Sequence, residues 1–149
     1  MKSYKLFIFF AALFGLLAVI MGAISSHAIG QGVENKEFLK SICDQCSLTE
    51  NGAELISKGI KYQFYHVAAL FGVGILSSLH RNYESTLLKL SGFSFILGII
   101  LFSGSLYLLA ITGNDSFSKT VPFGGTSFMF GWFFLMLYPL TRKKKSAKF

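Results

Sequence analysis

The stretch Leu101-Phe102-Ser103-Gly104-Ser105-Leu106-Tyr107-Leu108-Leu109-Ala110 decides the fold of this chain. It is apolar enough to lie in a membrane, yet it carries two serines, a glycine and a tyrosine. Polar groups inside a bilayer face the interior of a helix bundle, because an unpaired one is costly in hydrocarbon. The stretch therefore predicts the outer half of a third transmembrane helix, with other helices packed around it.

The composition of the chain supports a membrane protein. Its 149 residues predict one domain, and they are 52% hydrophobic and only 14% charged. An ordinary soluble domain is about 25% charged, and it could not hide so much apolar surface. The net charge of +7 does not indicate a nucleic-acid partner, because much of the basic excess lies in the tail 142–149. Next to hydrophobic spans, such a tail is typical of a membrane-orientation signal.

Apolar runs long enough to cross the hydrocarbon layer occur four times. The first is longer than the 7–15 apolar residues of a signal peptide, so we expect it to remain as a helix. The polar segment from Gly30 to Lys61 should form the first outer loop, with a short amphipathic helix starting near Lys36. The sequence thus predicts an all-α, polytopic membrane protein that forms one four-helix bundle over 1–149. The expected spans are about 6–24, 62–79, 87–111 and 123–140.

Small residues recur along the predicted spans. Four-residue spacing of small side chains lets two helix backbones approach closely in lipid. The third span carries small or polar residues on two opposed faces, so we expect it to be the central helix. The glycines expected at helix contacts are Gly15, Gly22, Gly98, Gly104, Gly124 and Gly131.

Polar residues inside the spans are expected to converge in the outer half of the bundle. The second span contributes Tyr62, Gln63 and His66, which share one arc of the helix. The third span contributes Ser103, Ser105 and Tyr107, and Thr126 and Ser127 begin the fourth. His27, at the end of the first span, is a possible further member. These residues define a predicted polar pocket.

Basic residues predict the orientation. Four spans place both termini on one side, and that side holds Lys2, Lys5, Arg81, Lys89 and the basic tail. By the positive-inside rule both termini are cytoplasmic. Cys43 and Cys46 then lie outside the cell, where a disulfide could form between them. A zinc site is not expected, because the sequence has no second cysteine pair, and a redox dithiol would need a thioredoxin-like βαβ setting, which is absent. A simple disulfide or free thiols remain.

Several short motifs match a known family in order and spacing. They are Gly22-Ala23 with His27-Ala28, Tyr62-Gln63 with His66, Leu101 to Tyr107, Pro122-Phe123-Gly124-Gly125, and Gly131-Trp132. Between about Ala11 and Trp132 the chain resembles the domain-of-unknown-function 423 family, also called transmembrane protein 256-like or uncharacterised protein family 0382. The resemblance implies a small four-helix protein of the bacterial inner membrane and carries no activity with it. Two departures stand out: Cys43 to Leu55 resembles an insertion, and Val121 replaces a usual Thr.

The function classes that remain differ in what the polar pocket does. The polar side chains either hydrogen-bond to each other and fix the helix register, or bind a lipid headgroup, quinone or other amphiphile. Haem between His66 and His27 is a further hypothesis, as is hydrolysis by Ser103 and His66, although no third catalytic group is visible. We expect no cofactor and no metal. An accessory role in a larger membrane complex, or a homo-oligomer, remains open.

Overall fold

The computed structural model describes residues 2–29, 52–79 and 85–141, with side chains up to Ser25 in the first of these ranges. All the elements in these ranges are helical. They are α1 (Ser3–Ile29), α3 (Gly52–Leu79), α4 (Thr86–Ile99), the π-helical segment η2 (Ile100–Gly104), α5 (Ser105–Thr112), the 3-10 turn η3 (Ser118–Thr120) and α6 (Val121–Leu140).

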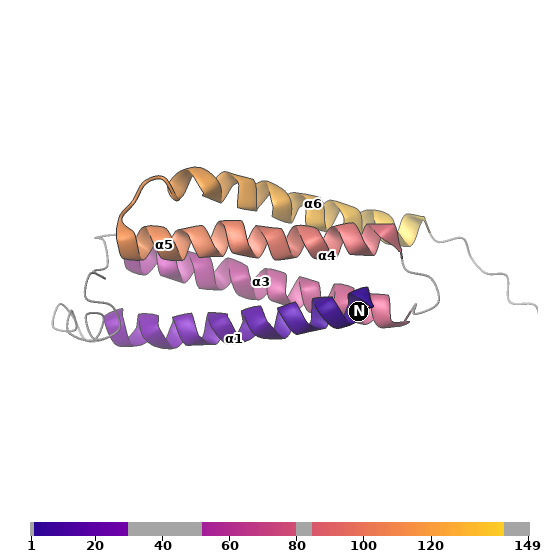
Figure 1. Ribbon diagram of the computed structural model, residues 1–149, viewed down its shortest axis with the longest axis horizontal. Coiled ribbons are helices and arrows are strands. Elements are labelled where there is room, and N and C mark those ends of the chain that lie inside the picture. The colour runs from indigo at the N-terminus through magenta and orange to yellow at the C-terminus, as the bar shows by residue number, and fades with distance from the viewer. Residues whose placement is uncertain (1, 30–51, 80–84, 142–149) are drawn as a thin grey trace, which may run out of the picture.

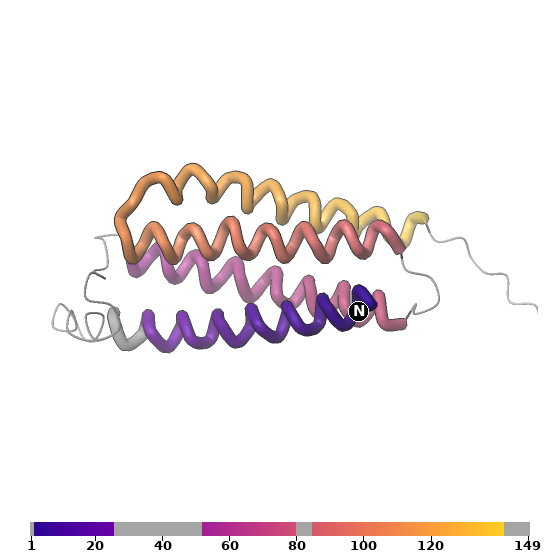
Figure 2. Tube along the Cα trace, viewed as in Figure 1, coloured from indigo at the N-terminus to yellow at the C-terminus, as the bar shows by residue number. Residues whose placement is uncertain are grey.

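Four long rods lie side by side and alternate in direction (Figures 1 and 2). The elements α4, η2 and α5 follow each other without a break and form the third rod. Four helices are long and apolar enough to cross a membrane: Ser3–Ser25, Gly52–Leu79, Thr86–Thr112 and Ser118–Leu140. The predicted all-α, four-helix membrane fold is therefore confirmed.

The third rod occupies the position that its two polar faces predict. It packs against α3 on one side and against α6 on the other, and α1 packs mainly against α3. The order across the bundle in Figure 1 is accordingly α1, α3, the third rod and α6. Large buried side chains fill the spaces between the rods. They include Phe7 and Phe14 of α1, Leu70 and Val73 of α3, Leu88, Phe95 and Ile99 of the third rod, and Phe128 of α6.

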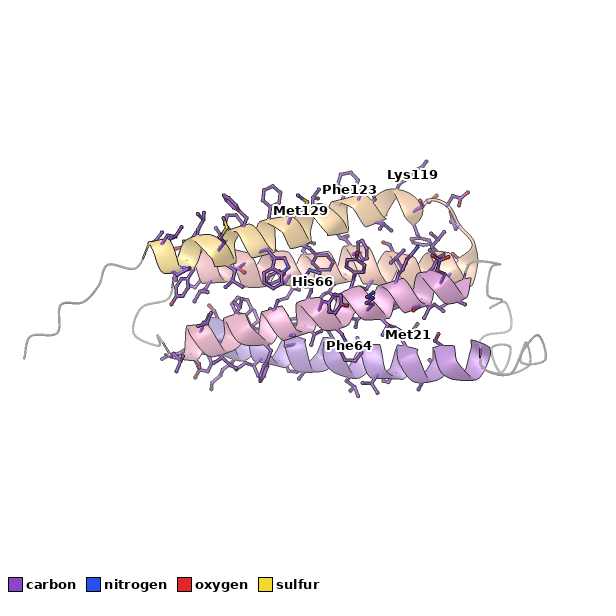
Figure 3. All side chains as sticks on the ribbon, turned by 180° about the vertical axis from the view of Figure 1, so that it is seen from behind. Met21, Phe64, His66, Lys119, Phe123 and Met129 are labelled. Carbon is purple, nitrogen blue, oxygen red and sulfur yellow. The ribbon has the colours of Figure 1, made fainter. Side chains whose placement is uncertain are left out.

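The outer surface of the bundle is apolar, as expected for helices that face acyl chains. Phe9 and Leu16 of α1 are more than half exposed, and so are Phe123 and Met129 of α6. Figure 3 shows Phe123 and Met129 projecting away from the other rods. A water-soluble bundle would bury such side chains, so this surface requires lipid around it.

The second helix begins earlier than the sequence indicates. Residues from Gly52 to Lys61, expected in the polar outer loop, form the first turns of α3. Their charges lie on the exposed side, where Glu54 and Lys58 form an ion pair of 2.6 Å, while Ile56 and Gly59 are buried. An amphipathic start of this kind extends the helix beyond its apolar run. The predicted helix near Lys36, together with Cys43 and Cys46, lies outside the described residues.

Three of the six expected contact glycines lie where helices approach most closely. A Cβ on Gly124 of α6 would collide with the backbone of Leu101 and Phe102. At Gly98 and Gly131 an added Cβ would collide with the rings of Phe128 and Phe95 respectively.

The other three expected glycines differ. A Cβ on Gly15 would make an ordinary contact of 3.6 Å with Val67. At Gly22 and Gly104 a Cβ would meet nothing within 4 Å among the described residues, apart from the helix's own backbone. Among the described residues, these two positions therefore show no close approach of a neighbouring helix.

A π-helical segment interrupts the third rod at the stretch that decides the fold. The segment η2 covers Ile100–Gly104, directly before Ser105 and the start of α5. Helices accommodate a π turn where local packing requires it, and such turns shift the direction of the residues that follow. Here the backbone of Leu101 and Phe102 lies against Gly124 of α6. No pattern in the sequence had indicated this segment.

Candidate functional site

Gln63 links three of the four rods. Its side chain is only 3% exposed. The Nε2 atom donates a hydrogen bond of 2.7 Å to the backbone oxygen of Phe14 in α1. The Oε1 atom accepts a hydrogen bond of 2.8 Å from the hydroxyl of Tyr107 in α5. Both ends of the amide are thus used between helices.

Ser103 adds a second bond between α3 and the third rod. Its hydroxyl is fully buried and donates a hydrogen bond of 2.9 Å to the backbone oxygen of Gly59. Gly59 also makes room for the Tyr107 ring, because a Cβ there would come within 2.6 Å of Cε1 of Tyr107. The glycine therefore allows Ser103 and Tyr107, four residues apart, to reach α3 together.

The hydrogen bonds of His66 determine which nitrogen carries the proton. Nδ1 lies 2.8 Å from the backbone oxygen of Tyr62, which can only accept a hydrogen bond. Nε2 lies 3.3 Å from Nε1 of Trp132, which can only donate one. Both contacts are satisfied when His66 is neutral and protonated on Nδ1. An imidazolium would lose the bond from Trp132.

Aromatic rings surround His66, which is 6% exposed. The ring of Phe128 in α6 stacks on it with a centroid distance of 3.4 Å and an interplanar angle of 7°. Phe95 lies 5.7 Å away, and Trp132 approaches edge-on at 6.3 Å. Figure 3 shows His66 between the rods, inside the bundle. The imidazole thus bridges α3 and α6.

A further polar bond joins the third rod to α6. Ser91 of α4 is fully buried and donates a hydrogen bond of 2.8 Å to the backbone oxygen of Gly131. Among the described residues, every buried side-chain nitrogen and oxygen has a hydrogen-bond partner. The interior polar groups in this part of the chain are therefore satisfied by the protein itself.

The structure brings together only part of the predicted pocket. Gln63, Ser103 and Tyr107 lie in the half of the bundle that is farther from the start of α1 and the end of α6. Tyr62 contributes its backbone oxygen to His66, and its half-exposed ring lies 4.9 Å from that of Phe102. Ser105 is buried. The side chain of His27 lies outside the described residues.

Thr126 and Ser127 do not join the cluster. The hydroxyl of Thr126 donates to the backbone oxygen of Phe123 at 2.8 Å, and that of Ser127 donates to the same oxygen at 3.0 Å. Both bonds stay within α6 and resemble the local back-bonding that Ser and Thr make in apolar helices. Their placement around the pocket was therefore wrong.

Ser103 and His66 do not hydrogen-bond to each other as a nucleophile and its base would. Ser103 donates its proton to Gly59, while both ring nitrogens of His66 face Tyr62 and Trp132. Within the described ranges no group of three or more His, Cys, Asp or Glu side chains could hold a metal ion. What the geometry offers is a set of hydrogen bonds between helices.

Comparison with known proteins identifies the family. A family model described as "Protein of unknown function (DUF423)" matches residues 21–125. The chain belongs to the DUF423 family. This DUF423 protein is 34% identical over 136 residues to a UPF0382 membrane protein of Staphylococcus saprophyticus, covering 89% of this chain and 95% of the relative. No solved structure matches it.

Two further relatives carry the same description. The UPF0382 membrane protein YwdK of Bacillus subtilis is 30% identical over 133 residues, covering 89% of this chain and 94% of the relative. The UPF0382 inner membrane protein YgdD of Escherichia coli is 29% identical over 145 residues, covering 96% and 95%. With its four apolar helices, this DUF423 protein is a multi-pass membrane protein surrounded by a lipid bilayer.

Two kinds of hydrogen-bonding group in this DUF423 protein were not predicted from its sequence. Trp132 was not among the predicted pocket residues, yet its indole donates a hydrogen bond to His66. Its N–H requires a partner when it lies within hydrocarbon, and that requirement could have pointed to an inward acceptor. The backbone oxygens of Phe14, Gly59 and Gly131 are the other acceptors. Side-chain patterns give no signal for them.

Proposed function

We propose that this DUF423 protein is a structural or accessory four-helix bundle of the bacterial inner membrane, with both termini in the cytoplasm. In this proposal its interior polar side chains hold the helices in register and do not bind a ligand. The single observation that carries the proposal is the use of both ends of the Gln63 amide, by Phe14 of α1 and Tyr107 of α5.

The other interior bonds support the same role. Ser103 joins η2 to α3, Ser91 joins α4 to α6, and Trp132 joins α6 to α3. Hydrogen bonds between membrane helices contribute only about 0.6–2 kcal/mol each, but sliding any of these rods by one turn would break them. The bonds therefore favour one register over its neighbours, which is what a scaffold requires.

The orientation rests on the distribution of charge. Basic residues in short segments next to membrane spans are retained in the cytoplasm. Lys2 precedes α1 and Lys5 lies in its first turn, and Arg142 to Lys145 follow α6 in the sequence. The name of the E. coli relative, an inner membrane protein, supports the same membrane for this chain.

Native mass spectrometry of gently extracted protein tests the structural role against ligand binding. If the bundle is a scaffold, the protein should carry only loosely held bilayer lipids, which increasing collision energy removes. The competing hypothesis is a site for a quinone, a lipid headgroup or another amphiphile. A stoichiometric molecule that stays bound in wild type, and is lost in His66→Leu or Gln63→Leu, would overturn the scaffold proposal.

Crosslinking in intact membranes distinguishes an accessory subunit of a larger complex from a self-sufficient structural bundle. An accessory subunit should give the same heterologous partners in repeated experiments, whereas a self-sufficient bundle should give only contacts within or between copies of this chain. A matched control is the same experiment on solubilised membranes, in which a weak accessory contact is expected to disappear.

A further inference from the structure

Charge is distributed very unevenly between the two ends of the bundle. The segments that lead into α1, connect α3 to α4 and follow α6 in the sequence, residues 1–5, 80–89 and 141–149, hold nine of the fourteen basic residues and one of the seven acidic residues. The net charge of these segments is +8, and that of the rest of the chain is −1, which together give the total of +7.

The folded part of the chain shows where this charge lies. The start of α1, the end of α3, the start of α4 and the end of α6 meet at one end of the bundle (Figures 1 and 2). We call it the basic end. Lys2 and Lys5 are exposed there, and Lys89 lies in the first turn of α4. At this end the described residues include no acidic side chain.

The opposite end of the bundle carries charges of both signs. Its described charges include two carboxylates, Glu54 and Asp115, beside Lys58, Lys61 and Lys119. Glu54 and Lys58 form an ion pair, so part of the positive charge is neutralised within the protein. Similar numbers of each sign leave this end without a strong field.

We propose that the basic end binds the phosphate groups of anionic phospholipids in the surrounding leaflet. The lysines at the start of α1 and of α4 lie where these apolar helices begin, and the five basic residues of the tail follow α6 in the sequence. Clusters of Lys and Arg next to a transmembrane helix attract anionic headgroups, at about 1 kcal/mol for each residue near the surface. The binding does not depend on which side of the membrane the basic end faces.

The single tryptophan of the chain gives a direct readout. Trp132 is 49% exposed on α6. It lies eight residues from the end of that helix at Leu140, about 12 Å at 1.5 Å per residue. This depth falls within the leaflet of the basic end, because half of the hydrocarbon layer is about 15 Å thick. Lipids with brominated acyl chains in that leaflet should therefore quench its fluorescence.

The experiment compares quenching of Trp132 in two lipid mixtures. In one, brominated phosphatidylglycerol is mixed with unbrominated phosphatidylcholine, and in the other, brominated phosphatidylcholine is mixed with unbrominated phosphatidylglycerol. We expect a relative binding constant of about fivefold in favour of phosphatidylglycerol, the factor that corresponds to ~1 kcal/mol at 25 °C. Equal constants for the two lipids in the full-length protein would overturn the proposal.

Two variants and one control assign the preference to the basic end. Two variants should each lower the ratio of the binding constants for phosphatidylglycerol and phosphatidylcholine toward one. The first combines Lys2→Gln with Lys5→Gln. The second, a tail variant, places Gln at Arg142, Lys143, Lys144, Lys145 and Lys148. The matched control replaces two exposed lysines at the opposite end, Lys61→Gln and Lys119→Gln, and should leave the ratio unchanged. A ratio that persists in both basic-end variants, or that falls equally in the control, would also contradict the proposal.

Discussion

The hydroxyl of Tyr107 in α5 donates a hydrogen bond of 2.8 Å to Oε1 of Gln63 in α3, across 44 positions of sequence. The same amide donates through Nε2 to Phe14 of α1. One polar chain thus crosses three rods inside an apolar interior. A group that loses its partner in such apolar surroundings is costly to leave unpaired, and this makes each member sensitive to substitution.

Gly124→Ala should destabilise the bundle. The added methyl group would collide with the backbone of Leu101 and Phe102, and backbone atoms cannot move aside as the end of a side chain can. Overpacking of this kind costs about 1–3 kcal/mol. We expect a lower midpoint of thermal unfolding in detergent, measured by circular dichroism.

Gly125→Ala is the matched control, since it makes the same chemical change one residue further along α6. A Cβ there would meet nothing within 4 Å among the described residues, apart from the backbone of α6 itself. We expect an unchanged or slightly higher midpoint, because Ala favours the helix more than Gly. Equal losses for Gly124→Ala and Gly125→Ala would contradict the close approach of α6 to η2.

His66→Leu should be inserted into the membrane normally and should lower thermal stability. The leucine cannot accept the hydrogen bond from Trp132, so the indole N–H is left without its partner in hydrocarbon. We expect a loss of about 1–2 kcal/mol, with the abundance in membranes unchanged. Thermal unfolding of purified protein and immunoblotting of membranes measure the two effects.

His66→Gln provides the comparison, because a glutamine oxygen can accept a hydrogen bond from the indole. It should recover part of the stability that His66→Leu loses. A melting midpoint for His66→Leu equal to that of wild type would show that the imidazole is not paired within the bundle.

Much of the architecture could be predicted from apolar length and from the spacing of small residues. The two polar faces of the third span indicated its central position, because a helix with lipid on one broad side would not carry both. The arc of α3 that contains Gln63, His66, Leu70 and Val73 is likewise buried. Helical periodicity expresses burial directly, so these features are visible in one sequence.

What could not be predicted depends on contacts between distant backbones. The π-helical turn at Ile100–Gly104 occurs where Gly124 of α6 approaches the backbone of the third rod, and no local pattern in the third span predicts this turn. The acceptors of Gln63, Ser103 and Ser91 are backbone oxygens, which every residue has. The early start of α3 at Gly52 was missed because its first turns are amphipathic and not apolar.

Ser91→Ala should weaken the contact between the third rod and α6. The serine hydroxyl donates to the backbone oxygen of Gly131 from a fully buried position. Its removal should cost about 0.6–2 kcal/mol, a fall of about 2–4 °C in the unfolding midpoint for each kcal/mol.

Ser127→Ala is a control for this substitution. Its hydroxyl bonds to Phe123 within α6, so the change removes no contact between helices. We expect a change within about 0.5 kcal/mol. A loss as large as that of Ser91→Ala would mean that bonds between helices have no special weight here.

The proposed orientation predicts the behaviour of fusions to the C-terminus. A green fluorescent protein joined after Phe149 should fluoresce, because it folds in the cytoplasm, and an alkaline phosphatase joined there should be inactive. Replacement of all five basic tail residues by glutamine should weaken this preference. Active phosphatase with a dark fluorescent fusion would place the termini outside the cytoplasm.

A double-mutant cycle on Tyr107→Phe and Gln63→Leu tests most directly whether interior polar pairs hold the helices together. The free energy of unfolding of wild type, both single variants and the double variant gives the interaction energy of the pair. We expect a favourable coupling of about 0.6–1.7 kcal/mol, with each single variant less stable than wild type. A coupling of zero, with additive effects of the two substitutions, would contradict a role of this pair in holding the helices together.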